Sequence, residues 1–354
     1  MFSTDYKFGI ELEFTGITRN KAAKTLADYL HGEVVPSLAQ PYLFGVDVIA
    51  PDGRRWSFVR DASIQCEKKE NGRIVSAGAG YSVELVSPIL TYASDIDDLQ
   101  SIVRKLRKAG GFANSSCGIH LHLDGAPHTV RSLRNLVLIV ASRNDLFYKA
   151  LQIEPARMRY CKKMDEYMVR RIEEKKPRTM KQLENIWYAG YNESRRTHYH
   201  DSRYHFLNLH SYFSAESKTV ELRGFNSTLH AGKVRSYIVF ALAINHQALT
   251  QKTARYKHVQ EENERFAMRT YLTRIGLNGD EYKACREHLS QHLSGNPAWR
   301  YGSRDNCKSH IARPDEQPNS DTSSDANSST NSSANSSTSS SANLGTNSSE
   351  EVEA

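Results

Sequence analysis

The stretch FGIELEF, residues 8–14, decides the fold of the N-terminal part of this chain. Its apolar residues alternate with other residues, and this two-residue period is typical of a β-strand, whose side chains point to opposite faces in turn. The apolar row therefore takes one face of the predicted strand, and Glu11 and Glu13 share the other face. Two carboxylates on one face repel each other, so the pair needs a compensating partner from elsewhere in the chain.

Three later segments show the same two-faced pattern: YSVELVSPIL at 81–90, GIHLHLD at 118–124 and TVELRGF at 219–225. In each of them, apolar side chains take one face of the predicted strand, and carboxylates, imidazoles or a guanidinium take the other. If the four strands lie in one sheet, its polar face collects seven such side chains, which are Glu11, Glu13, Glu84, His120, His122, Glu221 and Arg223.

This collection of side chains favours a divalent metal site. Clustered carboxylates are costly unless a cation lies among them. Oxygen ligands with an occasional imidazole suit Mg²⁺ or Mn²⁺ better than structural zinc, and an arginine on the same face can neutralise phosphate oxygens. A single outward-facing glutamate on an antiparallel strand is ordinary solvent surface. The coincidence of four patterned strands is what favours the metal site.

Before residue 314 the chain mixes predicted strands and helices without a regular βαβ alternation. The segment 46–64 is predicted to form two strands joined by a turn at Asp52-Gly53, and 204–213 is expected to pair with 219–225. Helices are expected at 20–31, 94–109 (capped by Ser94 or Asp95), 129–150, 162–176, 232–250 and 255–293. This order predicts an α+β fold, in which a strand-rich sheet is backed by helices.

The composition restricts the class of protein. The chain has 354 residues and is 39% hydrophobic, and no apolar run approaches the roughly 18 residues that span a bilayer. The first residues show no secretory signal. Five scattered cysteines, an odd number without a CxxC pair, argue against a disulfide scaffold and against a cysteine-type zinc site. We therefore expect a cytoplasmic protein without a membrane partner.

The charge is unevenly distributed along the chain. The part after Arg313 holds seven of the 40 acidic residues and none of the 47 basic ones, so residues 1–313 carry a net charge of +14. Such a body would suit a polyanion, although an enzyme with a basic surface is the more ordinary explanation. The tail at 314–354 is rich in Ser, Asn and Thr, and this composition predicts disorder.

Five motifs, in this order, resemble a known family: GIELEF, RDASI, VELVSP, CGIHLHLD and RYHFLNLHSYFSAESKTVELRGFNSTLHAGKV. They are similar to the amidoligases, which are related to glutamine synthetase and glutamate–cysteine ligase. The resemblance covers about residues 7–300, because 270–300 also looks like the C-terminal part of bacterial and phage members. It implies a curved, mostly antiparallel sheet with helices outside and an active site on its concave face. It also implies an ATP-dependent carboxylate–amine ligase that forms an amide or isopeptide bond through an acyl phosphate.

The resemblance assigns roles to individual positions. The metal ligands that it implies are Glu11, Glu13, Glu84, Glu221 and one or both of His120 and His122, with Mg²⁺ or Mn²⁺ as the ion. Arg223, Glu221 and Asp61 are the implied catalytic residues, and Arg223 would contact the transferred phosphoryl group. The residues expected beside nucleotide or substrate are His120, His122, Arg203 and Asn208.

The domain organisation and partners follow from the same resemblance. A catalytic domain is expected at 1–253, a helical extension packed on it at 254–313, and the acidic tail at 314–354. The implied partners are ATP and amine and carboxylate substrates, either small molecules or peptides. A peptide or a glutamine amidotransferase is the candidate protein partner.

Two other functions remain open from the residues alone. A metal-dependent amidase or phosphoesterase would use the same ligands around zinc or manganese without ATP. A nucleic-acid-binding protein would use the basic body, but the glutamate-lined face would repel phosphate unless a metal were bound. The sequence shows no Gly-x-x-x-x-Gly-Lys-Ser/Thr loop and no local Ser-His-Asp or Cys-His signature.

Overall fold

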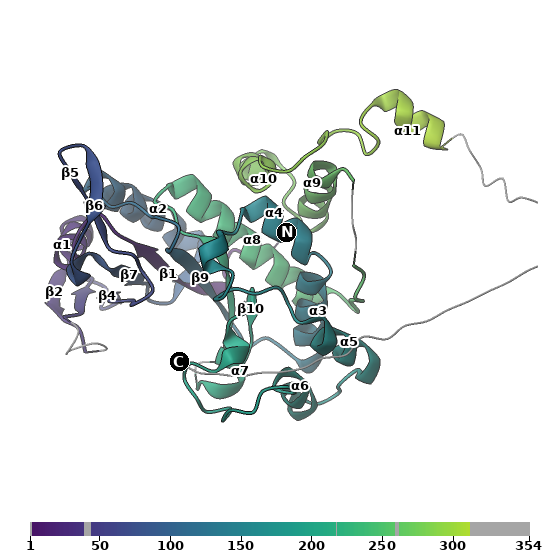
Figure 1. Ribbon diagram of the computed structural model, residues 1–354, viewed down its shortest axis with the longest axis horizontal. Helices are drawn as coiled ribbons and strands as arrows, with labels where there is room; N and C mark the ends of the chain where they lie inside the picture. Colours follow the sequence, from purple (N-terminus) through teal and green to yellow (C-terminus); the bar gives the residue numbers. More distant parts are fainter. Residues whose placement is uncertain (1, 39–43, 217, 259–261, 312–354) are drawn as a thin grey trace, which may run out of the picture. The chain divides into compact units, whose positions relative to one another are not determined.

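The computed structural model describes residues 2–38, 44–216, 218–258 and 262–311. Residues 1–310 form one compact unit, built from a large β-sheet and a set of helices packed against it (Figure 1). The predicted disordered tail at 314–354 lies outside the described residues. No helix among the described residues is both long and apolar enough to cross a membrane.

The main sheet is antiparallel at every pairing of its named strands. Its strand order is β10-β11-β9-β1-β7-β4-β3-β2, and β8 also pairs with β1. The strands are β1 Lys7–Phe14, β2 Glu33–Pro36, β3 Val46–Ile49, β4 Arg55–Val59, β7 Val83–Val86, β8 Leu90–Thr91, β9 Gly118–Asp124, β10 Leu207–Asn208 and β11 Thr219–Asn226. A separate hairpin joins β5 Glu67–Glu70 to β6 Arg73–Ser76. The predicted α+β class with a mostly antiparallel sheet is therefore confirmed.

The helices pack on the sheet and on one another. Helices α1 and α8 contact the sheet directly, α2 packs against α1 and α8, and α3 packs against α8. Farther along the chain, α9 and α10 pack against each other, and α10 packs against α8. The helices are α1 Arg19–Leu30, α2 Tyr92–Lys108, α3 Val130–Ala141, α4 Asn144–Leu151, α5 Glu166–Lys175, α6 Met180–Trp187, α7 His210–Ser214, α8 Ala231–Thr250, α9 Glu264–Arg274, α10 Lys283–Ser290 and α11 Arg304–Ile311. The predicted boundary between a catalytic domain at 1–253 and a helical extension at 254–313 stays a prediction.

The alternating pattern of β1 places apolar side chains on the face of the sheet that the helices cover and polar side chains on the opposite face. Its apolar side chains Phe8, Ile10, Leu12 and Phe14 are all buried in the core beneath the helices. Each buried aliphatic or aromatic side chain of this size contributes about 1.5–3 kcal/mol to folding. The strand lies between β9 and β7, so the polar side chains of its other face have neighbours on both sides.

Four local predictions differ from the structure. The predicted helix 255–293 is divided into α9 and α10. The predicted helix 94–109 begins at Tyr92, because Thr91 is its N-cap and Asp95 accepts a hydrogen bond from the Thr91 N–H at 2.7 Å. The predicted helix 129–150 is divided into α3 and α4. The predicted strand 204–213 is reduced to the two residues of β10. Asn208 Oδ1 accepts from the His210 N–H at 2.7 Å, and this turn leads into the short helix α7.

Candidate active site

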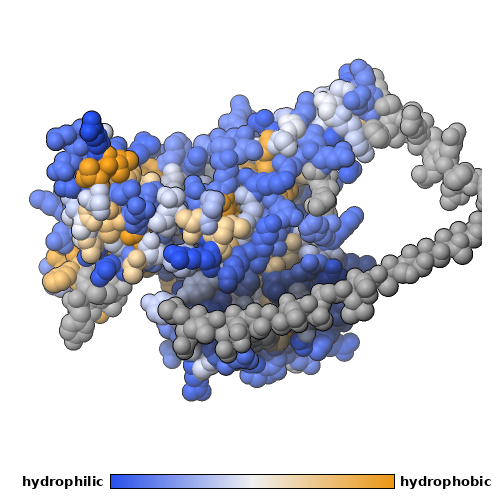
Figure 2. Space-filling model, in the orientation of Figure 1, coloured by the Kyte–Doolittle hydropathy of each residue, from blue (hydrophilic) through white to orange (hydrophobic). Residues whose placement is uncertain are grey.

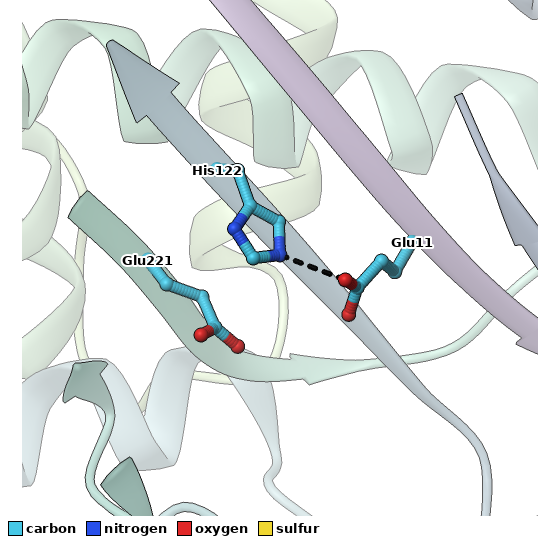
Figure 3. A group of neighbouring side chains, drawn as sticks. All are labelled: Glu11, His122 and Glu221. Atoms are coloured by element: carbon cyan, nitrogen blue, oxygen red, sulfur yellow. Dashed lines mark ion pairs between the residues drawn. The ribbon is translucent and has the colours of Figure 1, made fainter. Parts of the chain in front are cut away.

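The polar face of the sheet gathers side chains from its central strands. Glu11 of β1, His122 of β9 and Glu221 of β11 point toward one another, and one ligand atom from each lies within 4.8 Å of the others (Figure 3). The register explains the convergence, because Glu11 is opposite His120 across one pairing and Glu221 is opposite His122 across the next. The predicted common face of these strands is therefore present in the structure.

The carboxylate of Glu11 lies between two imidazoles. Its Oε2 is 2.7 Å from Nδ1 of His120, and its Oε1 is 3.0 Å from Nε2 of His122. Burial alone would raise the pKa of Glu11, but the two histidines hold it well below its usual value. Burial likewise opposes the charging of His122, yet Glu11 and Glu221 raise the pKa of His122 to about 9.

The two histidines differ in their surroundings. His120 is buried, with its Nδ1 3.8 Å from Glu221 Oε1 and its Nε2 3.7 Å from Glu13 Oε1. His122 is half-buried, and its contact with Glu11 is an ion pair without hydrogen-bond alignment. The Nε2 atom of His122 therefore has no hydrogen-bond partner among the described residues. Its other nitrogen, Nδ1, lies 3.4 Å from the Thr219 hydroxyl.

Glu221 is held at both oxygens. Its Oε1 accepts a short hydrogen bond from Nη1 of Arg223, and its Oε2 accepts from Nδ2 of Asn208 at 2.6 Å. Burial disfavours the charged carboxylate, but Arg223 and the two histidines lower the pKa of Glu221 to about 2. Asn208, predicted beside nucleotide or substrate, thus contacts Glu221 and fixes the direction of its carboxylate.

A second group of carboxylates is formed by Glu13 of β1 and Glu84 of β7. Glu13 is directly opposite Glu84, and its Oε2 accepts from the Gly118 N–H at 2.6 Å. Burial, followed by the charges of Glu11, Glu13 and Asp61, raises the pKa of Glu84 well above its usual value. Asp61 follows β4, and its Oδ1 accepts from the Ser63 N–H at 2.6 Å. The structure therefore brings Asp61 into the electrostatic field of the predicted cluster.

Arg157 is a supporting residue that the sequence did not reveal. Its buried guanidinium donates to the carbonyl oxygens of Phe225 at 2.6 Å and Arg223 at 3.0 Å. These carbonyls lie where the pairing of β11 with β9 shifts register, between Leu222 and Phe225. A Cβ atom on Gly118 would lie 2.2 Å from Nη2 of Arg157, so a side chain there would displace the guanidinium. The interior glycine at 224 was the one available signal of a bulge.

Arg203 lies apart from the carboxylates. Its Nη1 donates to the His198 carbonyl at 3.0 Å, and its guanidinium lies 5.4 Å from the ring centre of Tyr199 and 5.9 Å from that of Tyr204. Among the described residues it has no direct contact with the cluster. The remaining predicted site residues are all on or beside the polar face, and their roles in binding metal or nucleotide stay predictions.

Comparison with known proteins identifies the family to which this chain belongs. No curated protein matches this chain. A solved structure that resembles it is a bifunctional glutathione synthetase from Pasteurella multocida. The alignment has 12% identity and a TM-score of 0.34, and it covers 82% of this chain and 47% of that chain. This chain thus spans less than half of that protein's length, and so distant a likeness leaves the glutamine synthetase-like fold a prediction. The model of the family described as "Putative amidoligase enzyme" matches residues 4–245. That match spans more than half of the chain, which therefore belongs to this amidoligase family.

Proposed function

We propose that this amidoligase is an ATP- and Mg²⁺-dependent carboxylate–amine ligase that forms an amide or isopeptide bond. The observation that carries the proposal is the convergence of Glu11, His122 and Glu221 from three adjacent strands, with Arg223 hydrogen-bonded to Glu221. The family membership supports amide-bond formation. An anionic cluster that also holds an arginine suits phosphoryl transfer, which depends on positioning and charge neutralisation rather than on a protein nucleophile.

The residues fit a divalent cation. Glu11, His122 and Glu221 offer two carboxylates and one imidazole, and the ion would replace the proton between Nε2 of His122 and Glu11. Glu13 and Glu84, with Asp61 nearby, form a second set of oxygen donors whose mutual repulsion a cation would relieve. Bound Mg²⁺ or Mn²⁺ would neutralise the phosphate oxygens of ATP.

The two histidines take different parts in this proposal. His122 is the ligand, because its Nε2 is 3.0 Å from Glu11 Oε1 while Nδ1 is near the Thr219 hydroxyl. A hydrogen-bond partner at the second nitrogen orients a metal-binding imidazole. His120 is buried between Glu11, Glu13 and Glu221 and keeps those carboxylates apart.

The proposed reaction has two steps. A substrate carboxylate oxygen attacks the γ-phosphorus of ATP, which forms an acyl phosphate and releases ADP. An amine nitrogen then attacks the acyl carbon, phosphate leaves, and the nitrogen loses a proton as the amide forms. Arg223 stabilises the charge of the transferred phosphoryl group, and its Nη1 is held in place by Glu221. Asp61, which accepts one backbone hydrogen bond at Oδ1, is the proposed acceptor of the amine proton.

The test measures ATP turnover with Mg²⁺ and a panel of amino acids, polyamines and acidic peptides. Hydroxylamine traps an acyl phosphate as a hydroxamate, so mass spectrometry of the trapped product tests the first step separately from the second. We expect ADP and hydroxamate from the wild type. Glu11→Gln and Arg223→Ala should lose at least about a hundredfold in rate, the size expected for removing one charge-stabilising group.

The matched control is Glu33→Gln, which removes an exposed glutamate from β2 of the same sheet. It should keep wild-type activity. Full activity in Glu11→Gln would contradict the metal assignment. Substrate cleavage without nucleotide would instead favour the metal-dependent hydrolase, and tight polynucleotide binding that survives Glu11→Gln would favour the nucleic-acid-binding alternative.

A further inference from the structure

A continuous row of arginine and tyrosine side chains leads from the surface to the candidate active site. At its inner end, the guanidinium of Arg223 lies 5.9 Å from the ring centre of Tyr204, and its Nε is 3.4 Å from the Tyr160 carbonyl. The rings of Tyr204 and Tyr160 are 6.0 Å apart. Arg203 lies 5.9 Å from the Tyr204 ring, so this ring has an arginine from the active site and an arginine from the surface segment as neighbours.

The outer end of the row is open to solvent. Arg159 is exposed and lies 4.7 Å from the ring of Tyr160. Arg203 lies 5.4 Å from the ring of Tyr199, which is 68% exposed. The surface around α6, which precedes this segment in the sequence, is hydrophilic in the view of Figure 2.

The two outer arginines carry charge that no neighbour neutralises. Among the described residues, neither Arg159 nor Arg203 has an ion pair with a carboxylate, and the buried Nε of Arg203 has no hydrogen-bond partner. Glu193, an acid of the same segment, accepts a hydrogen bond from the Asp201 N–H at 2.6 Å. Arginine binds carboxylates with two parallel hydrogen bonds, so each of these guanidinium groups is suited to one anionic group of a ligand.

We propose that this row, Arg159, Tyr160, Tyr199, Arg203 and Tyr204, binds the substrate that supplies the carboxylate, and that this substrate is an acidic peptide. The inference rests on the proposed function, because it assigns a substrate class to the same site. Even an acidic amino acid keeps only one free carboxylate once its other carboxylate has been activated. Two further arginines outside the carboxylate cluster match a ligand with several carboxylates.

The spacing of the row agrees with an extended peptide. The contacts along it span 4.7 to 6.0 Å each, and an extended chain advances about 3.3–3.6 Å per residue. A few residues therefore reach from Arg159 to Arg223, and tyrosine faces lie between the cations, where they can pack against the stems of side chains. The positive row would also attract an acidic chain from a distance, in a manner that salt weakens.

The first experiment measures binding without ATP, by fluorescence anisotropy of a labelled hexaglutamate, a hexaglutamine of the same length and a single-stranded oligonucleotide. We expect the wild type to bind hexaglutamate at least tenfold more tightly than the other two ligands. The exposed Arg159→Ala should weaken hexaglutamate binding about tenfold, and Arg159→Ala with Arg203→Ala about a hundredfold. The control is Arg170→Ala on α5, an exposed arginine paired with Glu166, which should change binding less than twofold.

The second experiment measures ligation of the same peptide with ATP and Mg²⁺. The double variant should raise the KM for the peptide at least tenfold and leave kcat and the KM for ATP within twofold. Equal binding of hexaglutamate and hexaglutamine, preference for the oligonucleotide, a changed KM for ATP, or unchanged binding by Arg159→Ala would each overturn the proposal. If hexaglutamate binding depends on the two arginines but no ATP is consumed, the proposed ligase reaction is contradicted and the proposed peptide site is supported. If the wild type and the double variant ligate a single amino acid equally well, the proposed peptide site is contradicted and the proposed ligase reaction is supported.

Discussion

Replacing Arg157 by alanine tests how the active-site bulge is held. The guanidinium donates to the carbonyls of Phe225 and Arg223, where β11 leaves its regular pairing with β9. A hydrogen bond from a charged donor contributes about 1.5–3 kcal/mol, and an unpaired buried carbonyl costs about 1–3 kcal/mol. The variant regains part of this free energy, because it no longer has to bury the charged guanidinium away from water. We therefore expect Arg157→Ala to lower the free energy of unfolding by about 3 kcal/mol.

Urea denaturation followed by tryptophan fluorescence measures this loss, since Trp56 and Trp187 are both buried. With a urea dependence of about 3 kcal/mol per molar, the midpoint should fall by about 1 M. The control is Arg159→Ala, two residues along the chain, whose exposed side chain lies over the Tyr160 ring and has no hydrogen bond or ion pair with another described residue. It should change the free energy of unfolding by less than about 0.5 kcal/mol. An Arg157→Ala midpoint within 0.2 M of wild type would refute the view that this arginine holds the bulge.

Three other predictions concern the carboxylate cluster. Glu84→Gln removes one repelling charge, so at pH 8.5 the melting temperature of the metal-free protein should rise by about 2 °C. Added Mg²⁺ should raise the melting temperature of this variant less than that of the wild type. An undiminished effect of Mg²⁺ would count against Glu84 as a ligand. His122, with its pKa raised to about 9, stabilises the metal-free fold below about pH 6.5, and this contribution is lost as the pH rises through 9. Because the proton competes with metal, calorimetric Mg²⁺ affinity should increase from pH 7 to pH 9, and a flat profile would exclude His122 as a ligand. Asn208→Ala frees one oxygen of Glu221 and should reduce Mg²⁺ affinity ten- to a hundredfold, whereas unchanged affinity would show that this hydrogen bond has no positioning role.

The two-residue period of the sequence predicted the strands and their shared polar face. When the apolar row of a strand is buried in the core, Glu11, Glu13 and their partners must lie on the opposite face of the sheet. Pairing depends on contacts distant in sequence, so the positions of Glu84 opposite Glu13 and of His122 opposite Glu221 could not be read from the pattern. Local hydrogen bonds explain two of the errors, at Thr91 before α2 and at Asn208, whose Oδ1 accepts from the N–H of His210 where a helix begins.

Two further residues show where sequence reasoning reaches its limit. Arg157 has no periodicity of its own, and its importance comes from carbonyls on a strand far along the chain. Arg203 was expected beside nucleotide or substrate, and this role stays a prediction; its guanidinium lies near the rings of Tyr199 and Tyr204, and Arg223 is a second neighbour of the Tyr204 ring. The guanidinium of Arg157 and the Tyr204 ring beside Arg203 each lie close to a group that is distant in the sequence and that only the folded chain brings near.

The strand order affects how the protein matures during synthesis. Strand β11 is the last strand of the main sheet to be made, yet it lies against β9, one strand away from β1. A nascent chain that has reached only α6 already contains Glu11 and His122 but lacks Glu221 and Arg223. In the proposed function, the donor set of Glu11, His122 and Glu221 is therefore incomplete until β10 and β11 pair, although Glu13 and Glu84 of the second set are already present. Because such long-range pairing is slow to form, a cation that needs all three donors of the first set should bind at the end of folding and not at its beginning.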